Sequence, residues 1–204
     1  MKKLLVLLGL CTVHPHAESA FASLLLIPDH AHAVIGLYGG PGSVTQEVSV
    51  DSTDQTADGN IAVLHEVRPL VGVFAALEND RYRIGVAFDD LRGGGLSMQR
   101  LLFNADFRLP CGKGIRPMLG VGIGAVSSRA TIGGRTVSFD NGAYTLRGGA
   151  EYRFDPRQAF ECLIEYSRFL NAGSDTYVTE EVFTSYGLRE QNSLLLRLGY
   201  TYRF

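Results

Sequence analysis

Charged side chains of both signs recur at alternate positions within apolar segments of the chain. Guanidinium and carboxylate groups form strong charge-assisted hydrogen bonds, and a buried charge is costly unless it is paired. We therefore predict an ion-pair network inside the fold, in which Arg153 could oppose Glu161 and Arg147 could oppose Glu165. The predicted members of this network are Arg147, Glu151, Arg153, Glu161, Glu165 and Arg197. Further charges on the polar faces of the predicted strands are Arg83, Asp106, Arg108, Arg116 and Arg203.

Hydrolysis is the second chemistry to consider, because it needs a positioned base that is usually a histidine. His65 is the only histidine after Ala33, and no serine in a recognisable nucleophile motif surrounds it. The acidic residues Asp51, Asp54 and Asp58 do not have the spacing of an EF-hand calcium loop. We therefore predict no enzyme activity, no cofactor and no metal site, and we interpret His65 as an interfacial polar residue.

The first residues are typical of an export signal. Lys2 and Lys3 precede an apolar run from Leu4 to Val13. This run is too short for a membrane-spanning helix, which needs about twenty residues. We predict that residues 1–33 are a signal peptide cleaved after Ala33, with cleavage after Ala22 as the alternative, and that residues 34–204 are one domain.

Strand-like alternation covers most of the chain after this leader. Side chains of a strand point to opposite faces in turn, so alternation of apolar and polar residues indicates a strand with one buried face. The predicted strands are 34–48, 64–78, 81–91, 97–109, 115–128, 143–154, 158–170 and 193–204. No apolar stretch after the leader reaches the length of a spanning helix. The sequence predicts an all-β fold, an antiparallel up-and-down barrel of eight strands.

Three observations favour a barrel whose apolar face points outward into a membrane over a lipocalin-type barrel with an apolar interior. Connections alternate between short (78–80, 111–114, 155–157) and long (49–63, 129–142, 171–192), as in outer-membrane barrels with short periplasmic turns. Aromatic residues gather at the strand ends, where two membrane interfaces would select them. The polar faces carry charges that lipid would not tolerate at mid-membrane. We predict an outer-membrane location with both termini in the periplasm.

The opening Gly36-Leu37-Tyr38-Gly39-Gly40 and the ending Tyr200-Thr201-Tyr202-Arg203-Phe204 carry a family resemblance. With the predicted strand number, residues 34–204 resemble the small eight-stranded outer-membrane barrels, which include the transmembrane domain of outer membrane protein A and the opacity-type surface proteins. The resemblance implies no shared catalytic site. It implies an assembly signal, read by the barrel-assembly machinery, at Leu198, Tyr200, Tyr202 and Phe204. It also implies contact with outer-membrane lipid and lipopolysaccharide.

The function that we predict is a non-enzymatic surface barrel that presents extracellular loops for adhesion or envelope interaction. The connection 171–192 holds Tyr177, Phe183 and Tyr186 among charged residues, and these aromatics could bind a host or surface protein or simply pack the loop. A small porin is the alternative, and a lipid-modifying enzyme is less favoured. The net charge of −2 gives no support for a nucleic-acid partner.

Removal of Phe204 should impair membrane assembly more than it impairs the finished barrel. One interfacial aromatic side chain contributes about 1.5–3 kcal/mol by burial, which should not unfold a closed barrel. The deletion variant should refold in detergent but accumulate or be degraded in the periplasm, as measured by cell fractionation. Normal levels of the variant in the outer membrane would contradict the assembly-signal interpretation.

Overall fold

The alternating segments form nine strands in the computed structural model, which describes residues 31–52, 60–109, 114–170, 174–179 and 182–204. Residues 33–204 form one unit, and the predicted signal peptide lies almost entirely outside the described residues. No helix in the described part of the chain is long and apolar enough to cross a membrane. The strands are β1 (His32–Ser52), β2 (Asn60–Glu78), β3 (Tyr82–Gly93), β4 (Leu96–Arg108), β5 (Ile115–Ile132), β6 (Arg135–Asp155), β7 (Gln158–Leu170), β8 (Ser174–Thr179) and β9 (Val182–Arg203).

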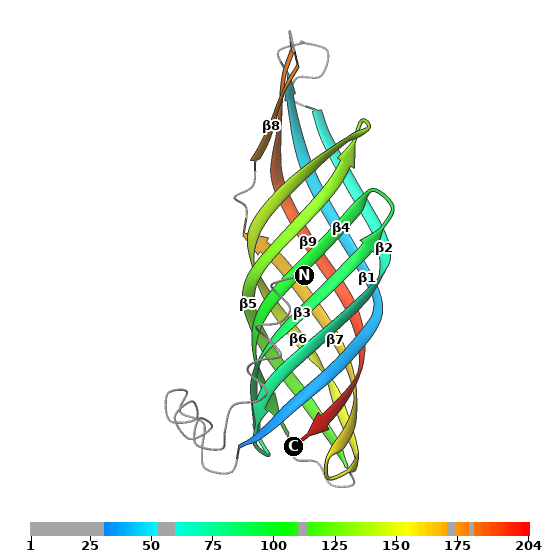
Figure 1. Ribbon diagram of the computed structural model, residues 1–204, viewed down its shortest axis with the longest axis vertical. Coiled ribbons are helices and arrows are strands. Elements are labelled where there is room, and N and C mark those ends of the chain that lie inside the picture. Colours follow the sequence, from blue (N-terminus) through cyan, green and yellow to red (C-terminus); the bar gives the residue numbers. More distant parts are fainter. Residues whose placement is uncertain (1–30, 53–59, 110–113, 171–173, 180–181) are drawn as a thin grey trace. The chain divides into compact units, whose positions relative to one another are not determined.

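Antiparallel pairing closes the strands into a ring (Figure 1). Each strand from β1 to β7 pairs with the next, β7 pairs with β9, and β9 returns to β1 with Val34 opposite Arg203. The short strand β8 pairs with the start of β9 and stands outside the ring. The predicted up-and-down barrel of eight strands is therefore confirmed, formed by β1–β7 and β9.

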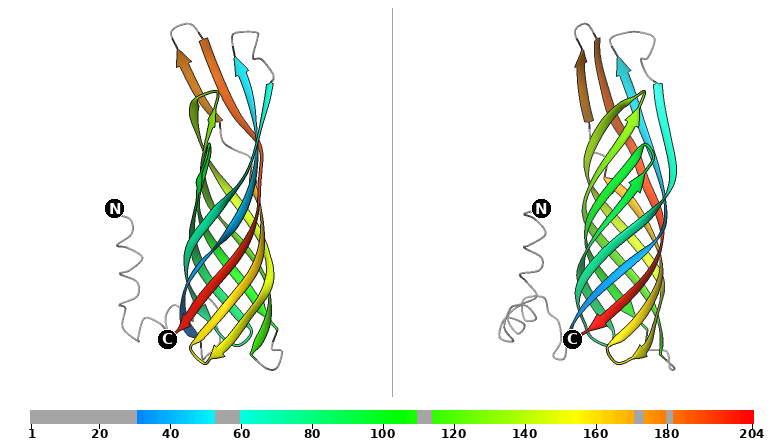
Figure 2. Two further views of the ribbon diagram at one scale, coloured as in Figure 1. Left: turned by 90° about the vertical axis from the view of Figure 1, so that its right-hand side faces the viewer. Right: turned by 45° about the vertical axis from the view of Figure 1, so that its right-hand side comes forward.

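The two ends of the barrel differ. At one end, which we call the turn end, residues 79–81, 109–114 and 156–157 connect the strands, and β1 begins where β9 ends. At the other end, which we call the loop end, β1, β2, β8 and β9 project furthest (Figure 2). A membrane-spanning strand needs about 9–11 residues, whereas β9 has 22 and β1 has 21. The excess length forms a projecting part of the sheet at the loop end.

The predicted long connection 129–142 is a strand hairpin instead. β5 continues to Ile132 and β6 starts at Arg135, so that only two residues turn the chain. These residues, Gly133 and Gly134, have φ values of 57° and 80°, which two-residue hairpin turns require and which glycine adopts without strain. The outward-facing residues of this segment are polar, so the sequence lacks the outward apolar residues that identified the other strands.

Side-chain burial shows that the apolar faces point outward. Leu119 and Ile123 are 64% and 65% exposed, although they lie in the middle of a strand. Arg100 and Arg108, on the opposite face of β4, are 1% and 0% exposed. This arrangement is the inverse of a soluble barrel, and it places the polar faces inside, as the sequence predicted.

Glycine residues in β1 and β2 accommodate two aromatic rings inside the ring of strands. A Cβ atom on Gly72 would lie 2.4 Å from the ring of Tyr38, and a Cβ atom on Gly36 would overlap the ring of Phe74. The rings of Tyr38 and Phe74 lie 6.4 Å apart. The glycine-rich opening, whose faces the sequence left unassigned, therefore lets β1 present Tyr38 to the lumen beside β2.

The lumen changes character along the barrel. Towards the loop end it is filled by an apolar cluster in which residues from opposite walls meet, such as Leu91, Val126, Phe139, Tyr186 and Leu195. Towards the turn end it is filled by charged side chains. The barrel thus contains a conventional hydrophobic core at one end and an ionic core at the other.

Ile164→Arg should destabilise the barrel by about 2–4 kcal/mol in lipid, the cost of a charge on the lipid face near the midplane. Ile164 is 58% exposed, and it lies in the middle of β7 between Gly148 and Leu196. The control is Ser127→Arg on the exposed face of β5 near the loop end, where the cost should fall to about 0–1 kcal/mol. Denaturant titration of vesicle-inserted protein measures both, and equal costs would reject the outward assignment of the apolar face.

Candidate functional site

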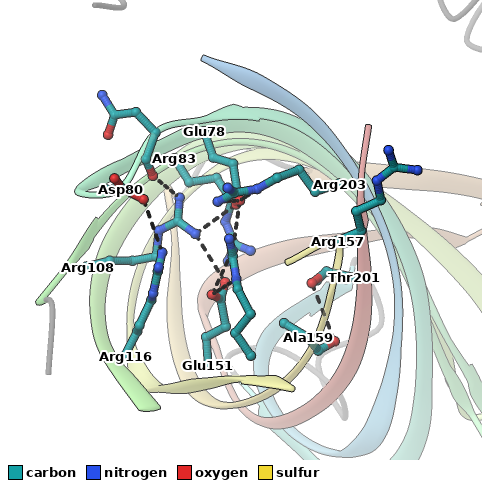
Figure 3. A network of polar contacts seen from close by, with 12 residues as sticks. Glu78, Asp80, Arg83, Arg108, Arg116, Glu151, Arg157, Ala159, Thr201 and Arg203 are labelled. Atoms are coloured by element: carbon teal, nitrogen blue, oxygen red, sulfur yellow. Dashed lines mark hydrogen bonds and ion pairs between the residues drawn. The ribbon is translucent and has the colours of Figure 1, made fainter. Parts of the chain in front are cut away.

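The charges at the turn end converge on one carboxylate. Glu78, the last residue of β2, accepts hydrogen bonds from Arg108 at 2.8 Å, Arg153 at 2.9 Å and Arg203 at 2.5 Å. Glu151 accepts from Arg108 at 3.1 Å and from Arg153 at 2.9 Å. We call these five residues the mouth cluster, and Figure 3 labels Glu78, Arg108, Glu151 and Arg203 among them. Because they come from β2, β4, β6 and β9, the cluster joins distant strands across the lumen.

Arg108 also fixes the connection between β2 and β3. Its Nη2 atom donates to the backbone oxygens of Asn79 at 2.6 Å and Tyr82 at 3.2 Å. Asn79 in turn accepts hydrogen bonds from the backbone N–H groups of Arg81 and Tyr82 through its side-chain oxygen. The buried guanidinium therefore adds hydrogen bonds to a turn in which the Asn79 backbone N–H also donates to the Tyr82 carbonyl at 2.9 Å.

A second set of charges, the central cluster, lies deeper in the lumen. Its first half is built on Asp106, which accepts from Arg83 at 2.9 Å and from Arg147 at 2.6 Å. Arg83 also donates to Glu161 and lies 4.9 Å from the centre of the Phe74 ring. These side chains come from β3, β4, β6 and β7, so the ion pairs again cross the lumen.

The other half of the central cluster is built on Glu165. Arg100 lies 2.8 Å and Arg197 lies 2.7 Å from its carboxylate oxygens. Arg100 also makes a two-pronged contact with Asp89, at 2.7 and 2.8 Å. The Tyr38 hydroxyl donates to Asp89 at 2.9 Å, and Arg197 lies 3.6 Å from the Tyr38 ring centre. Each guanidinium in this group therefore faces either a carboxylate or an aromatic face.

All six predicted network residues take part in ion pairs inside the ring of strands, but one of the two suggested pairings differs. Arg147 does oppose Glu165, with 4.0 Å between Nη1 and Oε2. The suggested pair of Arg153 with Glu161 is wrong. The strand register places Arg153 opposite Ala159. The Arg153 side chain instead reaches Glu78 across the lumen. Glu161, which stands opposite Glu151, pairs with Arg83.

Three further network residues, Glu78, Asp89 and Arg100, were not in the predicted set. Glu78 and Arg100 lie within the predicted strands 64–78 and 97–109, on the inward parity. Arg100 shares the parity of Asn104 and Asp106 on β4, and Glu78 shares that of Phe74 on β2. Assigning every charge of that parity to the lumen would have found both. The pairing itself depends on cross-lumen distances, which a sequence does not contain.

The central cluster contains equal numbers of positive and negative side chains. The central cluster has four arginines, Arg83, Arg100, Arg147 and Arg197, and four acids, Asp89, Asp106, Glu161 and Glu165. A cavity of about 10 Å³ lies among these side chains, lined in part by Phe74, Asn104 and Asp106. That volume is about the space of a single water molecule. The central lumen is thus filled by neutralised charges.

His65 lies outside the lumen. It is on the exposed face of β2, and its Nδ1 atom is 2.9 Å from the Thr45 hydroxyl oxygen. No group of three or more metal-binding side chains occurs among the described residues. The acidic residues Asp54 and Asp58 fall outside the described residues, as does Cys111. Among the described residues, the buried ion pairs therefore link strands, and the side-chain hydrogen bond of His65 is the one with Thr45.

Three of the predicted assembly-signal residues, Leu198, Tyr200 and Tyr202, lie on the outward parity of β9, and Phe204 directly follows the strand. Leu198 and Phe204 are 54% and 64% exposed. The Tyr202 and Phe204 rings lie 5.1 Å apart, and the Tyr200 ring lies 5.8 Å from that of Phe160. These contacts describe an aromatic belt at the turn end, and the signalling role remains a prediction.

The three aromatics predicted for loop binding occupy different environments. Tyr186 is 5% exposed and belongs to the apolar cluster at the loop end. Tyr177 and Phe183 lie in the β8–β9 hairpin, where Tyr177 pairs with Thr184 and Val178 pairs with Phe183. Of the two interpretations of the loop aromatics, binding and packing, Tyr186 therefore fits packing.

Comparison with protein-family models and with curated protein sequences gave no match. Among solved structures, Neisserial surface protein A is similar with a TM-score of 0.54 at 12% sequence identity, covering 82% of this chain and 97% of that chain. The outer membrane protein OprG from Pseudomonas aeruginosa has a TM-score of 0.51 at 11% identity, covering 86% of this chain and 97% of that chain. The chain has the fold of small outer-membrane β-barrels, so the predicted resemblance is confirmed at the level of fold.

Glu78→Gln should destabilise the barrel by about 3–5 kcal/mol, because removing one partner leaves buried charges uncompensated. Three arginines share this carboxylate, whose side chain is 1% exposed. Glu66→Gln is the matched control, since its pair with Arg68 has side-chain exposures of 18% and 34% and should contribute at most about 1 kcal/mol. Denaturant titration in detergent compares them, and equal losses would show that the mouth cluster contributes no more than a surface pair.

Proposed function

We propose that the chain is an outer-membrane β-barrel that is closed to solutes and acts by presenting its projecting strands to partners outside the cell. The observation that carries this proposal is the filled lumen combined with strands much longer than a membrane span. The lumen provides no described passage, whereas the excess strand length builds a platform at the loop end. The function is that of a scaffold for recognition rather than of an enzyme.

The outward face supports the membrane location. Apolar side chains such as Leu37, Leu146 and Leu198 are more than half exposed, which water would penalise but hydrocarbon would not. Aromatic side chains ring the turn end, including the pair Tyr82 and Phe107 with centres 5.4 Å apart. An export signal and delivery by the barrel-assembly machinery complete this proposal, and the surrounding lipid includes lipopolysaccharide.

The ionic and apolar fillings of the lumen argue against the porin alternative. An ion entering from the turn end would meet the mouth cluster and then the neutral central cluster. It would next meet the apolar cluster, where Leu91, Leu195 and Val44 are 0% exposed. An eight-stranded barrel is just wide enough for its side chains to fill it, and this one is filled by two different kinds of core.

The β8–β9 hairpin is the best candidate for the recognition surface. β8 and the start of β9 form an antiparallel ribbon, and β1 pairs along the other side of β9 up to Ser52 opposite Thr184. The ribbon thus continues the sheet at the loop end. Tyr177 and Phe183 are the residues that we propose for contact with a partner protein, while the buried Tyr186 anchors the ribbon in the apolar cluster.

Replacement of residues 174–183 by a Gly-Ser linker of equal length should abolish adhesion and leave the barrel folded. The exchange spares the buried residues Thr184, Tyr186 and Leu188. Binding of protein-loaded vesicles to epithelial cells should fall by about tenfold or more, the effect of losing about 1.4 kcal/mol. The control replaces residues 132–135 in the β5–β6 hairpin. Equal binding by both variants would move the recognition site, and stepwise conductance of the parent protein in planar bilayers would reject the closed lumen.

A further inference from the structure

The outer wall of the barrel contains a depression of about 590 Å³ near the turn end. It spans β3, β4, β5 and β6, and its lining is apolar except for Asp106 and Arg147 of the central cluster. The apolar and small lining residues are Tyr82, Ile84, Ala105, Phe107, Leu119, Gly120, Val121 and Leu146. Its volume falls within the range of about 300–1,000 Å³ that is usual for small-molecule sites.

Small residues create this depression. Pairing places Ala105 between Ile84 on β3 and Val121 on β5, so a methyl group stands between two branched side chains. In the next row, Leu119 stands between Phe107 on β4 and Gly148 on β6. Gly120 lies on the inward parity between these rows, where a Cβ atom would overlap the carboxylate of Asp106. On the outward face, the small side chain of Ala105 thus leaves a groove bordered by the larger Ile84 and Val121.

The groove has a defined border at the turn end. Tyr82 and Phe107 are paired across β3 and β4, and their rings lie 5.4 Å apart. Tyr82 is 50% exposed and directly follows Arg81, an exposed residue of the β2–β3 connection. The Arg81 backbone N–H donates to Asn79, and its guanidinium group has no ion-pair partner among the described residues. A positively charged residue therefore directly precedes Tyr82, which borders the apolar groove at the turn end.

From this arrangement we infer that the groove holds one acyl chain of a phospholipid, whose phosphate group binds Arg81. The inference rests on the proposed function, because it requires the outward face to be embedded in lipid. The groove is continuous with that lipid-facing band, which makes hydrocarbon its occupant. Its position next to the short connections assigns the lipid to the leaflet on the turn-end side. An extended chain would cover Ala105 and lie between Tyr82 and Leu146.

The depression also bears on the ion pair beneath it. Asp106 and Arg147 line the groove from the lumen side. The Arg147 Nε atom lies 2.6 Å from the Asp106 Oδ1 atom. Hydrocarbon over Gly120 would exclude water from this pair, since only the glycine backbone separates it from the outside. The bound chain would thereby protect a contact on which the central cluster depends.

Native mass spectrometry of the full chain tests the inference. The protein is inserted into nanodiscs of phosphatidylethanolamine and phosphatidylglycerol and then released into mild detergent. The parent protein should retain one phospholipid. Ala105→Phe, which fills the groove, should lower the fraction carrying lipid by about tenfold. Ala125→Phe makes the same change on the exposed face of β5, opposite Leu101 and Gly142, and should retain the lipid.

Two further measurements separate the parts of the inference. Arg81→Gln should lower phospholipid retention and leave the retention of added diacylglycerol, which has no phosphate, unchanged. Equal retention by Ala105→Phe and Ala125→Phe would overturn the groove site, and indifference to Arg81→Gln would overturn the phosphate contact. Retention of lipopolysaccharide in preference to phospholipid would overturn the leaflet assignment. Heat-shifted gel mobility monitors insertion, so failure of the parent protein to insert would reject the proposed function instead.

Discussion

The cost of placing a charge against hydrocarbon is the constraint on which the rest of this structure depends. Strand geometry sends alternate side chains to opposite faces, so a strand with arginine and glutamate at every second position must turn that face away from lipid. Eight such strands can satisfy this requirement only by closing, because an open edge would leave backbone groups unpaired in the membrane. Closure then forces the charges together, and they must neutralise one another within a lumen that holds little water. Glycine residues at Gly36, Gly72 and Gly120 follow from the same crowding, since each gives space to a ring or a carboxylate.

The ionic core performs the joining that a hydrophobic core performs in a soluble protein. Glu78 contacts arginines from β4, β6 and β9, and Glu165 contacts arginines from β4 and β9. Such contacts cross the lumen and thus connect strands that are not neighbours in the sheet. Buried ion pairs are poor sources of net stability, but losing one partner is costly, so they penalise any register in which a charge lacks a partner. A slip of one residue would also turn every charge towards lipid. Both effects select one register for the barrel.

Alternation predicted the fold because it reports a local property, the direction of each side chain relative to the sheet. The inward faces of β4, β6 and β7 follow from residues such as Asp106, Arg147 and Glu165 without knowledge of any partner. Pairing across the lumen is not local, and for this reason the partner of Arg153 was Glu78 rather than Glu161. The hairpin at Gly133 and Gly134 was missed because its outer residues are polar on both sides of the turn, where the strands leave the lipid. For the loop aromatics the sequence left binding and packing open, and packing holds for Tyr186 because the projecting strands carry an apolar core of their own.

The two cores divide the barrel between two tasks. Where lipid surrounds the wall, the lumen must hold the charges, and no inward position there is free for a ligand. Beyond the lipid, the wall can carry polar residues outside and apolar residues inside, so the strands continue as an ordinary protein sheet. β9 belongs to both parts, since it runs from the aromatic belt at Phe204, through the ion pair of Arg197, to the buried ring of Tyr186. Under the proposed function, recognition would fall to the two surfaces that neither core occupies. One is the projecting ribbon at the loop end, and the other is the lipid-facing wall, where small residues such as Ala105 open a groove.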